Sequence, residues 1–351
     1  MQHPPLENVP QVGGRPEFDN LLAVLRRGRP ARPTLFEFFL NPRLYRRLLG
    51  RPAEDAAPLT IFDIAEAFRR AGYDYVTYLA PNFTFPKQSH ERKASYSLNA
   101  GSMISDAASF EAYPWPDPDR ADYDLVEALG LALPQGMKII AYGPGGVLEN
   151  AVGILGFDNL CCLLADEPDL IRAVFDAIGS RLLRYYERVL EYPGVGAIIG
   201  NDDWGFKTQP MLSPADLRRY VFPWHRRIVA AAHAAGRPAI LHSCGNASEI
   251  WGDIIDDLRY DAKHSYEDAI EPVEDAYEKY GSRIAILGGM DVDFVIRSPI
   301  EAVYERSARM LDRADSRGGY ALGTGNSVPE YVPDANYFAM TRAALDRRGD
   351  G

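Results

Sequence analysis

The feature of this sequence that most constrains its fold is a regular alternation of short apolar runs with amphipathic helical segments. Eight strand-like runs follow one another along the chain: residues 33–40, 73–79, 137–143, 195–201, 238–244, 260–265, 283–289 and 319–325. They are apolar through most of their length, as expected of strands that are covered on both faces. Strands that alternate with helices in this way predict a parallel sheet with crossover helices.

Eight such units predict an α/β fold, a (β/α)8 TIM barrel, formed as a single domain by residues 15–345. An open, doubly wound sheet is the alternative. We expect the Pro-rich residues 1–14 to form a flexible lead-in. Residues 81–120, between the second and third strands, are polar and rich in Pro, Ser and aromatic side chains. They predict an inserted loop that caps one mouth of the barrel.

The residues that begin and interrupt one predicted helix are especially clear. In residues 213–236, Ser213 is placed as the N-cap and Pro214 at the first helical position. Pro223 then predicts a break or kink inside the same helix, because proline has no amide hydrogen to donate.

Charge and cysteine content exclude several classes of protein. The formal net charge of −11 argues against a nucleic-acid-binding surface, and the sequence carries no membrane-binding signal. No apolar run reaches the roughly 18 residues of a membrane span, and the N-terminal residues lack the order of a signal peptide.

Three cysteines do not build a disulfide framework, so we expect a cytoplasmic protein. Cys161 and Cys162, in an apolar helical run, are interpreted as buried, inert thiols.

Polar side chains concentrate where the predicted strands end, and barrel active sites lie at the C-terminal ends of the strands. We expect substrate contacts from Glu37, Asn41, Trp204, Asp291, Thr324 and Asn326. We expect catalytic roles for Asp202, Asp203 and His264. One of the two adjacent aspartates is also a candidate cap of the following turn.

His242 and Cys244 raise the question of a metal. At positions i and i+2 of a strand, their side chains share one face, with Cβ atoms about 7 Å apart. Imidazole and thiolate both bind zinc. A third ligand must then come from another strand, and His264 is the leading candidate, with Asp202 or Asp203 as alternatives. The competing interpretation is a hydrogen-bonded His242 beside a Cys244 that only packs.

Other common catalytic motifs are absent. The Gly-Pro-Gly-Gly run at 143–146 lacks the Lys-Ser/Thr of a P-loop and the spacing of a dinucleotide fingerprint. We interpret it as a turn where the backbone approaches a ligand or a neighbouring residue. The sequence has no Gly-x-Ser-x-Gly elbow and no His-Glu-x-x-His, so hydrolase functions lack support.

Several segments in order, among them NDDWGFKTQPMLSPADLRRYVFPWHRRIV at 201–229, ILHSCGN at 240–246, AILGGMDVDFVIRSPIEAV at 285–303 and ALGTGNSVPEYVPDANYFAM at 321–340, resemble the uroporphyrinogen decarboxylase superfamily. The resemblance covers residues from about 15 to 345 and implies a (β/α)8 barrel. The superfamily contains true decarboxylases and methyltransferases that pass methyl groups to or from corrinoid proteins.

Two differences from the true decarboxylases favour the methyltransferase branch. Those enzymes carry an RQAGR segment after the first strand, which is absent from PTLFEFFLNPRLYRRLLG at 33–50. They also carry a histidine in an LGHG-like motif, where this chain has LGTG with Thr324.

The thiol-methylating branch binds zinc through His-x-Cys and a late cysteine. His242 and Cys244 match the first two ligands, and the third falls on Thr324. The resemblance therefore implies a methyltransferase or demethylase component, with zinc as a cofactor, a corrinoid (cobalamin) protein as a partner, and a small thiol or pterin as acceptor. A zinc-free member is an alternative. So are a uroporphyrinogen decarboxylase acting on a tetrapyrrole and a barrel that binds a ligand without chemistry.

Overall fold

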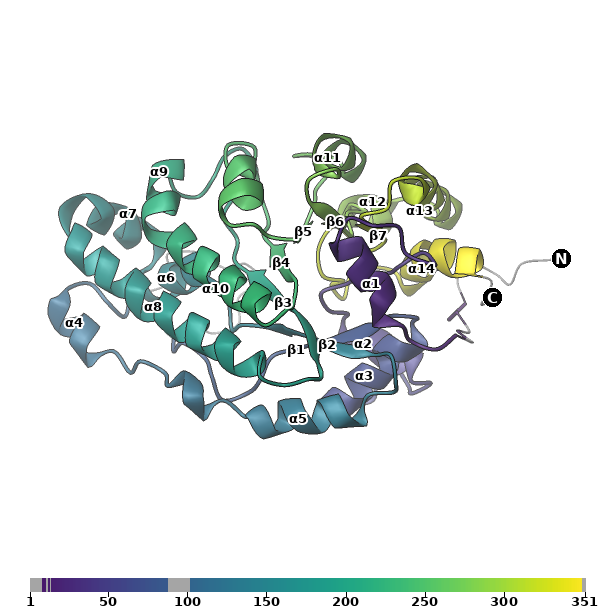
Figure 1. Cartoon of the computed structure of the whole chain (residues 1–351), viewed down its shortest axis with the longest axis horizontal. Coiled ribbons are helices and arrows are strands. Elements are labelled where there is room, and N and C mark those ends of the chain that lie inside the picture. Colours follow the sequence, from purple (N-terminus) through teal and green to yellow (C-terminus); the bar gives the residue numbers. More distant parts are fainter. Residues whose placement is uncertain (1–7, 11, 13, 88–101, 349–351) are drawn as a thin grey trace.

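A computed structural model of the chain describes residues 8–10, 12, 14–87 and 102–348 (Figure 1). The predicted lead-in at 1–14 and the predicted loop at 81–120 therefore fall partly outside the described residues, and both stay predictions.

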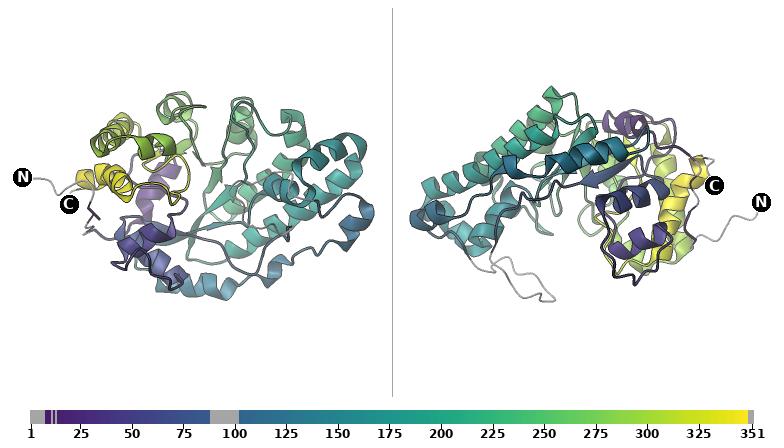
Figure 2. Two further views of the ribbon diagram at one scale, coloured as in Figure 1. Left: turned by 180° about the vertical axis from the view of Figure 1, so that it is seen from behind. Right: turned by 90° about the horizontal axis from the view of Figure 1, so that it is seen from below.

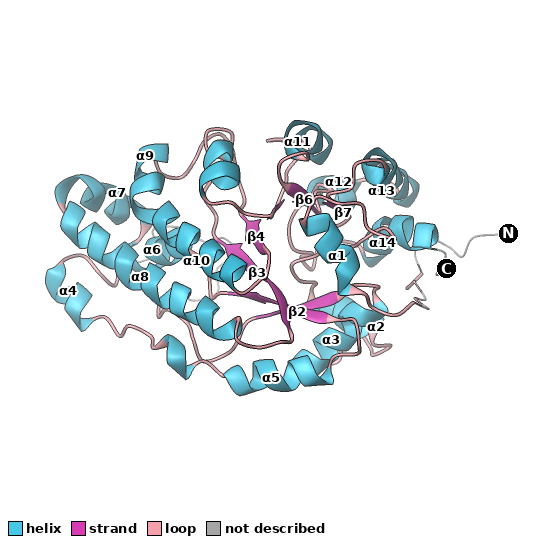
Figure 3. Cartoon of the chain, in the orientation of Figure 1, coloured by secondary structure: helices cyan, strands magenta, loops and turns pink. Residues whose placement is uncertain are grey.

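The centre of the molecule is a parallel sheet whose strands follow one another in chain order, β1-β2-β3-β4-β5-β6-β7 (Figure 3). The strands are β1 (Tyr75–Tyr78), β2 (Lys138–Tyr142), β3 (Val195–Asn201), β4 (Ala239–His242), β5 (Ala262–His264), β6 (Ala285–Leu287) and β7 (Tyr320–Ala321). Each lies inside one of the predicted runs, and every pairing is parallel. Seven of the eight predicted strands and the α/β class are thus confirmed.

The predicted first strand, residues 33–40, forms only an isolated parallel bridge from Leu35 to Leu322, beside β7. On its other side the described residues show no backbone ladder to β1. The hydroxyl of Tyr75 contacts the amide and the carbonyl oxygen of Glu37 at 2.7 Å each, and the hydroxyl of Thr77 donates to the carbonyl of Phe38 at 2.5 Å. Side-chain hydroxyls therefore occupy backbone groups that a ladder would use.

Helices surround the sheet (Figure 1). They are α1 (Phe18–Leu25), α2 (Pro42–Leu48), α3 (Ile61–Arg70), α4 (Ala107–Ala112), α5 (Tyr123–Ala132), α6 (Val147–Leu155), α7 (Phe157–Asp166), α8 (Pro168–Val189), α9 (Pro214–Asp216), α10 (Phe222–Ala234), α11 (Val273–Tyr280), α12 (Val292–Arg297), α13 (Ile300–Asp315) and α14 (Asp334–Arg348). Short 3₁₀ and π turns occupy η1 (Pro118–Arg120), η2 (Leu217–Val221) and η3 (Asp253–Asp257). The first helices lie beside the last ones, so the two halves of the chain meet at one side (Figure 2).

The predicted break at Pro223 takes a definite form. The hydroxyl of Ser213 accepts from the amide of Asp216 at 3.1 Å and so caps α9, as expected. The π turn η2 then leads into α10, where Pro223 occupies the first turn. A proline inside a helix removes an amide donor, and a π turn is one way for the helix to accommodate it.

One prediction about packing is wrong. Cys161 and Cys162 are exposed, not buried. In α7 only Leu160 and Leu163 are buried, and these two positions, three residues apart, share one helix face. The intervening pair is rotated away from that face.

In the described residues, no single helix is long and apolar enough to span a membrane. The pair α6 and α7 meets the length and composition criteria only jointly, with a bend of 96° between them.

Candidate metal centre

Histidine, cysteine and aspartate side chains come together at the carboxyl ends of β3, β4 and β5. Asn201 pairs in register with His242, and His242 with His264. Asp203 and Cys244 each lie two residues past these paired positions. Since the strands are parallel, the residues that follow them emerge at the same edge of the sheet.

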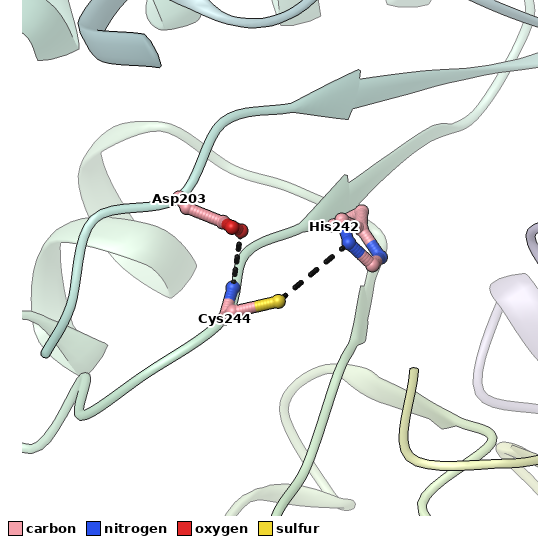
Figure 4. A group of neighbouring side chains, drawn as sticks. All are labelled: Asp203, His242 and Cys244. Carbon is pink, nitrogen blue, oxygen red and sulfur yellow. Dashed lines mark hydrogen bonds between the residues drawn. The ribbon is translucent and has the colours of Figure 1, made fainter. Parts of the chain in front are cut away.

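Asp203, His242 and Cys244 form a group whose candidate ligand atoms all lie within 4.8 Å of one another (Figure 4). The sulfur of Cys244 is 3.8 Å from Nε2 of His242. The backbone amide of Cys244 donates to Oδ1 of Asp203 at 2.7 Å, which holds the carboxylate beside the sulfur. One thiolate, one imidazole and one carboxylate are a donor set that zinc accepts, so the residues fit a zinc ion.

His264 lies behind this group instead of completing it. Its Nδ1 is 2.8 Å from Nδ1 of His242, and its Nε2 is 3.2 Å from the carbonyl oxygen of Thr324. A carbonyl oxygen only accepts, so Nε2 of His264 carries its proton and Nδ1 accepts from His242. Both ring nitrogens are therefore occupied. The third member of the group is Asp203, one of the alternatives considered, and not the favoured His264.

The same chain of bonds sets the tautomer of His242. Its Nδ1 carries the proton, so Nε2 presents a lone pair toward Cys244. Burial lowers the pKa of His242 well below its usual value and that of His264 to about 3, so both rings are neutral. A neighbour that fixes the ring and tautomer of a ligating histidine is a general feature of metal sites.

The sulfur of Cys244 receives two further contacts. Oγ of Ser265 and Nδ2 of Asn326 each lie 3.3 Å from it. Burial, with a contribution from the Asp203 charge, raises the pKa of the thiol to about 12. The thiolate therefore needs a nearby cation at neutral pH, which a divalent metal supplies.

Ser265 was not singled out from the sequence. It follows β5 directly and has a backbone φ of 86°, a conformation that non-glycine residues seldom adopt. Such backbone strain gathers at functional sites. The only signal in the sequence was a polar residue directly after a strand, which many loops share.

Asp202 makes different contacts from its neighbour, and the catalytic roles expected of both stay predictions. It is buried, and its two carboxylate oxygens accept the amides of Leu148 and Glu149, each at 2.9 Å. Oδ2 also contacts Nε2 of His225 at 2.9 Å. These bonds hold the first turn of α6 against the end of β3, so the structure places Asp202 as a cap.

The turn at 143–146 contributes to that arrangement. A Cβ atom on Gly146 would lie 2.1 Å from the side chain of Asp202, so only glycine fits there. The expectation that this backbone approaches a neighbour is confirmed. Burial and the charges of Asp202 and Asp203 raise the pKa of Glu149, in the first turn of α6, to about 8.

The predicted substrate-contacting residues are mostly engaged within the protein. Glu37 accepts the amide of Thr324 at 2.7 Å and contacts its hydroxyl at 2.7 Å. Asn41 caps α2 and Asp291 caps α12. The described contacts bring Asn326, alone of the six, to the ligand group. Their roles toward a substrate stay predictions.

Trp204 lies away from the ligand group. Its ring packs against Phe222 and His225 of α10, with centroid distances of 5.0 and 4.9 Å. The aromatic wall beside His242 is made instead by Phe38, whose ring centroid lies 4.8 Å from the imidazole and 4.9 Å from Tyr142. Neither residue was singled out from the sequence, where both occupy ordinary apolar positions of the predicted strands.

A parallel α/β sheet with a candidate metal site at its carboxyl edge defines a class of barrel-like enzymes. Residues 102–346 match the model of the family described as Uroporphyrinogen decarboxylase (URO-D), and the chain belongs to that family.

Among curated relatives, a uroporphyrinogen decarboxylase of Anaeromyxobacter sp. (strain Fw109-5) is 28% identical over 224 residues, or 63% of this chain and 62% of the relative. A uroporphyrinogen decarboxylase of Anaeromyxobacter dehalogenans (strain 2CP-C) is 25% identical over 75% of this chain and 74% of the relative. The chain thus matches less than two thirds of the length of the first of these.

Among solved structures, a methyltransferase from Methanosarcina mazei superposes with a TM-score of 0.68 and 15% identity, covering 93% of this chain and 97% of that one. At this identity the likeness shows that the two chains share a fold.

Proposed function

We propose that this protein transfers a methyl group between a small molecule and a corrinoid carried by a separate protein, using zinc held by Asp203, His242 and Cys244. The observation that carries the proposal is the convergence of those three ligand atoms within 4.8 Å at the edge where barrel enzymes act. The shared fold with a methyltransferase is consistent with it.

A zinc ion bound there would hold a substrate thiol as its thiolate near neutral pH, or polarise a methoxy oxygen. The chain's own residues prepare for this. The His264–His242 pair presents an unprotonated Nε2, while Ser265 and Asn326 approach the Cys244 sulfur with polar hydrogens. Phe38 excludes water from one side of His242.

In the thiol direction, the substrate thiol would lose its proton to solvent and its sulfur would supply the electron pair of the new carbon–sulfur bond. The methylated corrinoid would supply the methyl carbon and keep the bonding pair of its cobalt–carbon bond. A methyl group carries no charge, so this chemistry needs no cage of arginines. None of the described contacts of Asp203, His242 and Cys244 is made by an arginine.

We also propose that residues 33–40 complete an eight-stranded barrel beside β7, and that residues 81–120 shape the surface that receives the corrinoid protein. The Leu35–Leu322 bridge supports the first statement. The position of α4 and η1 after β1 in the chain is compatible with the second. Residues 88–101 of that segment lie outside the described residues.

The second candidate is decarboxylation of a porphyrinogen, which the names of the curated relatives favour. One experiment decides between the two. Purified protein, analysed for zinc, is given methylcobalamin or cob(I)alamin with a panel of thiols, pterins, methylamines and methoxy compounds, and separately a porphyrinogen. We expect a spectral change of the corrinoid with at least one substrate. Loss of carbon dioxide from the porphyrinogen, with no reaction in the panel, would favour the second candidate.

A further inference from the structure

A second polar site lies on the outer side of β5, and its central residue is Lys263. Side chains alternate along a strand, and His264 faces the interior, where its ring meets Phe36. Lys263 therefore faces the helices. Only 2% of it is exposed, which is rare for a lysine that has no carboxylate partner.

The ammonium of Lys263 is bonded to carbonyl groups alone. Nζ donates to the carbonyl of Ser265 at 2.7 Å and to that of Ser243 at 3.2 Å. Within the described part of the chain it forms no ion pair. An ammonium has three donors, so one remains for another acceptor.

A crevice of about 180 Å³ adjoins this ammonium. Its lining includes Asn246, Ser248, Trp251, Tyr266 and Ile270. Nζ lies 4.6 Å from the centroid of the Tyr266 ring and 5.6 Å from that of Trp251. The crevice thus combines a buried positive charge with aromatic and apolar walls, a combination typical of small-molecule sites.

Among the described residues, no acidic side chain of the crevice forms an ion pair with Lys263, although the charges of Glu271 and Glu267 favour its ammonium form. Glu271 is already paired with Lys279 at 2.8 Å. Glu267 also lines the crevice and is half-buried, and its carboxylate has no ion-pair or hydrogen-bond partner among the described residues. One cation and one anion, not paired with each other, therefore face the same small space.

We propose that this crevice binds a small zwitterion of the amino-acid or betaine class, with its carboxylate on Lys263 and its cationic nitrogen toward Glu267. A simple anion would leave Glu267 unpaired in the crevice, and a simple cation would leave Lys263 so, whereas a zwitterion satisfies both. The crevice adjoins the metal centre, because the carbonyl of Ser265 accepts from Lys263 while its hydroxyl contacts the Cys244 sulfur. Zwitterion binding there does not depend on the proposed methyl transfer.

Calorimetric titration of the full chain tests this. Glycine, alanine and glycine betaine are compared with acetate and methylammonium at concentrations up to about 10 mM. This range covers the dissociation constants expected of such small ligands. We expect at least one zwitterion to bind about tenfold or more tightly than either single-charge compound, because each charged contact contributes separately.

Two variants and a control locate the binding. Glu267→Gln should weaken zwitterion binding about tenfold and leave any acetate binding unchanged, because only the cationic end loses its partner. Lys263→Met should abolish both, with circular dichroism to show that it folds. Glu249→Gln makes the same charge change on an exposed residue nearby that does not line the crevice, and should change nothing.

Two results would overturn the proposal. One is that no zwitterion in the panel binds to the wild-type chain. The other is that acetate or methylammonium binds as tightly as the zwitterions and Glu267→Gln has no effect on the zwitterions, which makes the crevice a site for a single charge.

Discussion

Two strand ends of this molecule carry similar polar residues and put them to different use. Past β3 and β4, Asp203, His242 and Cys244 turn their ligand atoms toward one another. Elsewhere, the carboxyl group of Glu37 contacts both the backbone amide and the hydroxyl of Thr324, each at 2.7 Å.

The difference teaches what makes a polar strand end available for chemistry. Glu37 is buried with its oxygens already bonded, so the pair serves the protein's own structure. At the first end, Nε2 of His242 is left without a proton, and its contact with the Cys244 sulfur is long, at 3.8 Å. That end can accept a cation, and the Glu37 end cannot do so without losing its hydrogen bonds.

The sharpest test of the comparison removes the sulfur. Cys244→Ala should lower bound zinc to background and activity by at least about 100-fold, since metal assistance is worth several kcal/mol of the barrier. Elemental analysis and methylcobalamin turnover measure the two effects. Cys161→Ala, which removes an exposed thiol elsewhere, is the matched control and should alter neither. Full zinc content in Cys244→Ala would contradict the assignment.

The adjacent residues Asp202 and Asp203 allow the same comparison between two neighbouring side chains. Asp203→Asn should lower zinc affinity and turnover by about 10- to 100-fold with little change in stability, since a charged ligand becomes neutral. Asp202→Asn should lower the free energy of unfolding by about 1–3 kcal/mol, because the NH2 group of asparagine would face one of the two backbone amides that the carboxylate accepts. Urea unfolding and zinc competition separate them. If the two variants behave alike, the division is wrong.

His264 can be tested by a substitution that copies its bonds. His264→Leu should weaken zinc binding about 10-fold, because nothing then fixes the tautomer of His242. His264→Gln should recover most of that affinity, since its amide can donate to the Thr324 carbonyl and accept from Nδ1 of His242. Zinc competition with a chelator at fixed pH reads out both variants. Equal losses in the two would show that His264 contributes volume and not orientation.

The smallest expected effect is on the free energy of unfolding at Glu37, and it depends on pH. Burial raises the pKa of Glu37 to about 8 from a usual value of 4.5. The folded chain therefore holds a proton that the unfolded chain releases, and the stabilisation, complete below about pH 4.5, is lost as pH rises toward 8. Glu37→Gln copies the neutral acid. It should match the wild type near pH 4 and exceed it by about 1 kcal/mol or more above pH 8.

Urea unfolding at both pH values measures this difference, with exposed Glu330→Gln as the control for loss of a carboxylate. A constant offset between Glu37→Gln and wild type at all pH values would mean that Glu37 is ionised in the folded protein.

Much of the fold could be predicted from sequence because periodicity is a local property. The runs that became β1 to β7 are continuous apolar segments between helices, and burial on two faces leaves that pattern in the sequence. The first strand could not be judged in the same way. Whether residues 33–40 pair with β1 depends on the hydroxyls of Tyr75 and Thr77, about 40 positions away in the chain.

The site was predictable only in part. The shared face of His242 and Cys244 follows from the geometry of a strand. The choice between Asp202 and Asp203 depended on which side of β3 each side chain leaves, and α6 captures the first. His264 looked like a ligand because its register beside His242 is correct. The orientation of its ring, set by the carbonyl of Thr324, has no signature in the sequence.

The hydroxyl contacts between β1 and residues 37–38 have a consequence for where the structure opens locally. Elsewhere around the sheet, ladders of amide–carbonyl bonds must break together before neighbouring strands separate. At this seam the links are a few side-chain bonds, each of which can exchange for water singly. Local opening requires less free energy where fewer cooperative bonds hold a segment. Amide protons of residues 37–40 should thus exchange with solvent sooner than those of β3, and the first local separation should occur between residues 37–38 and β1.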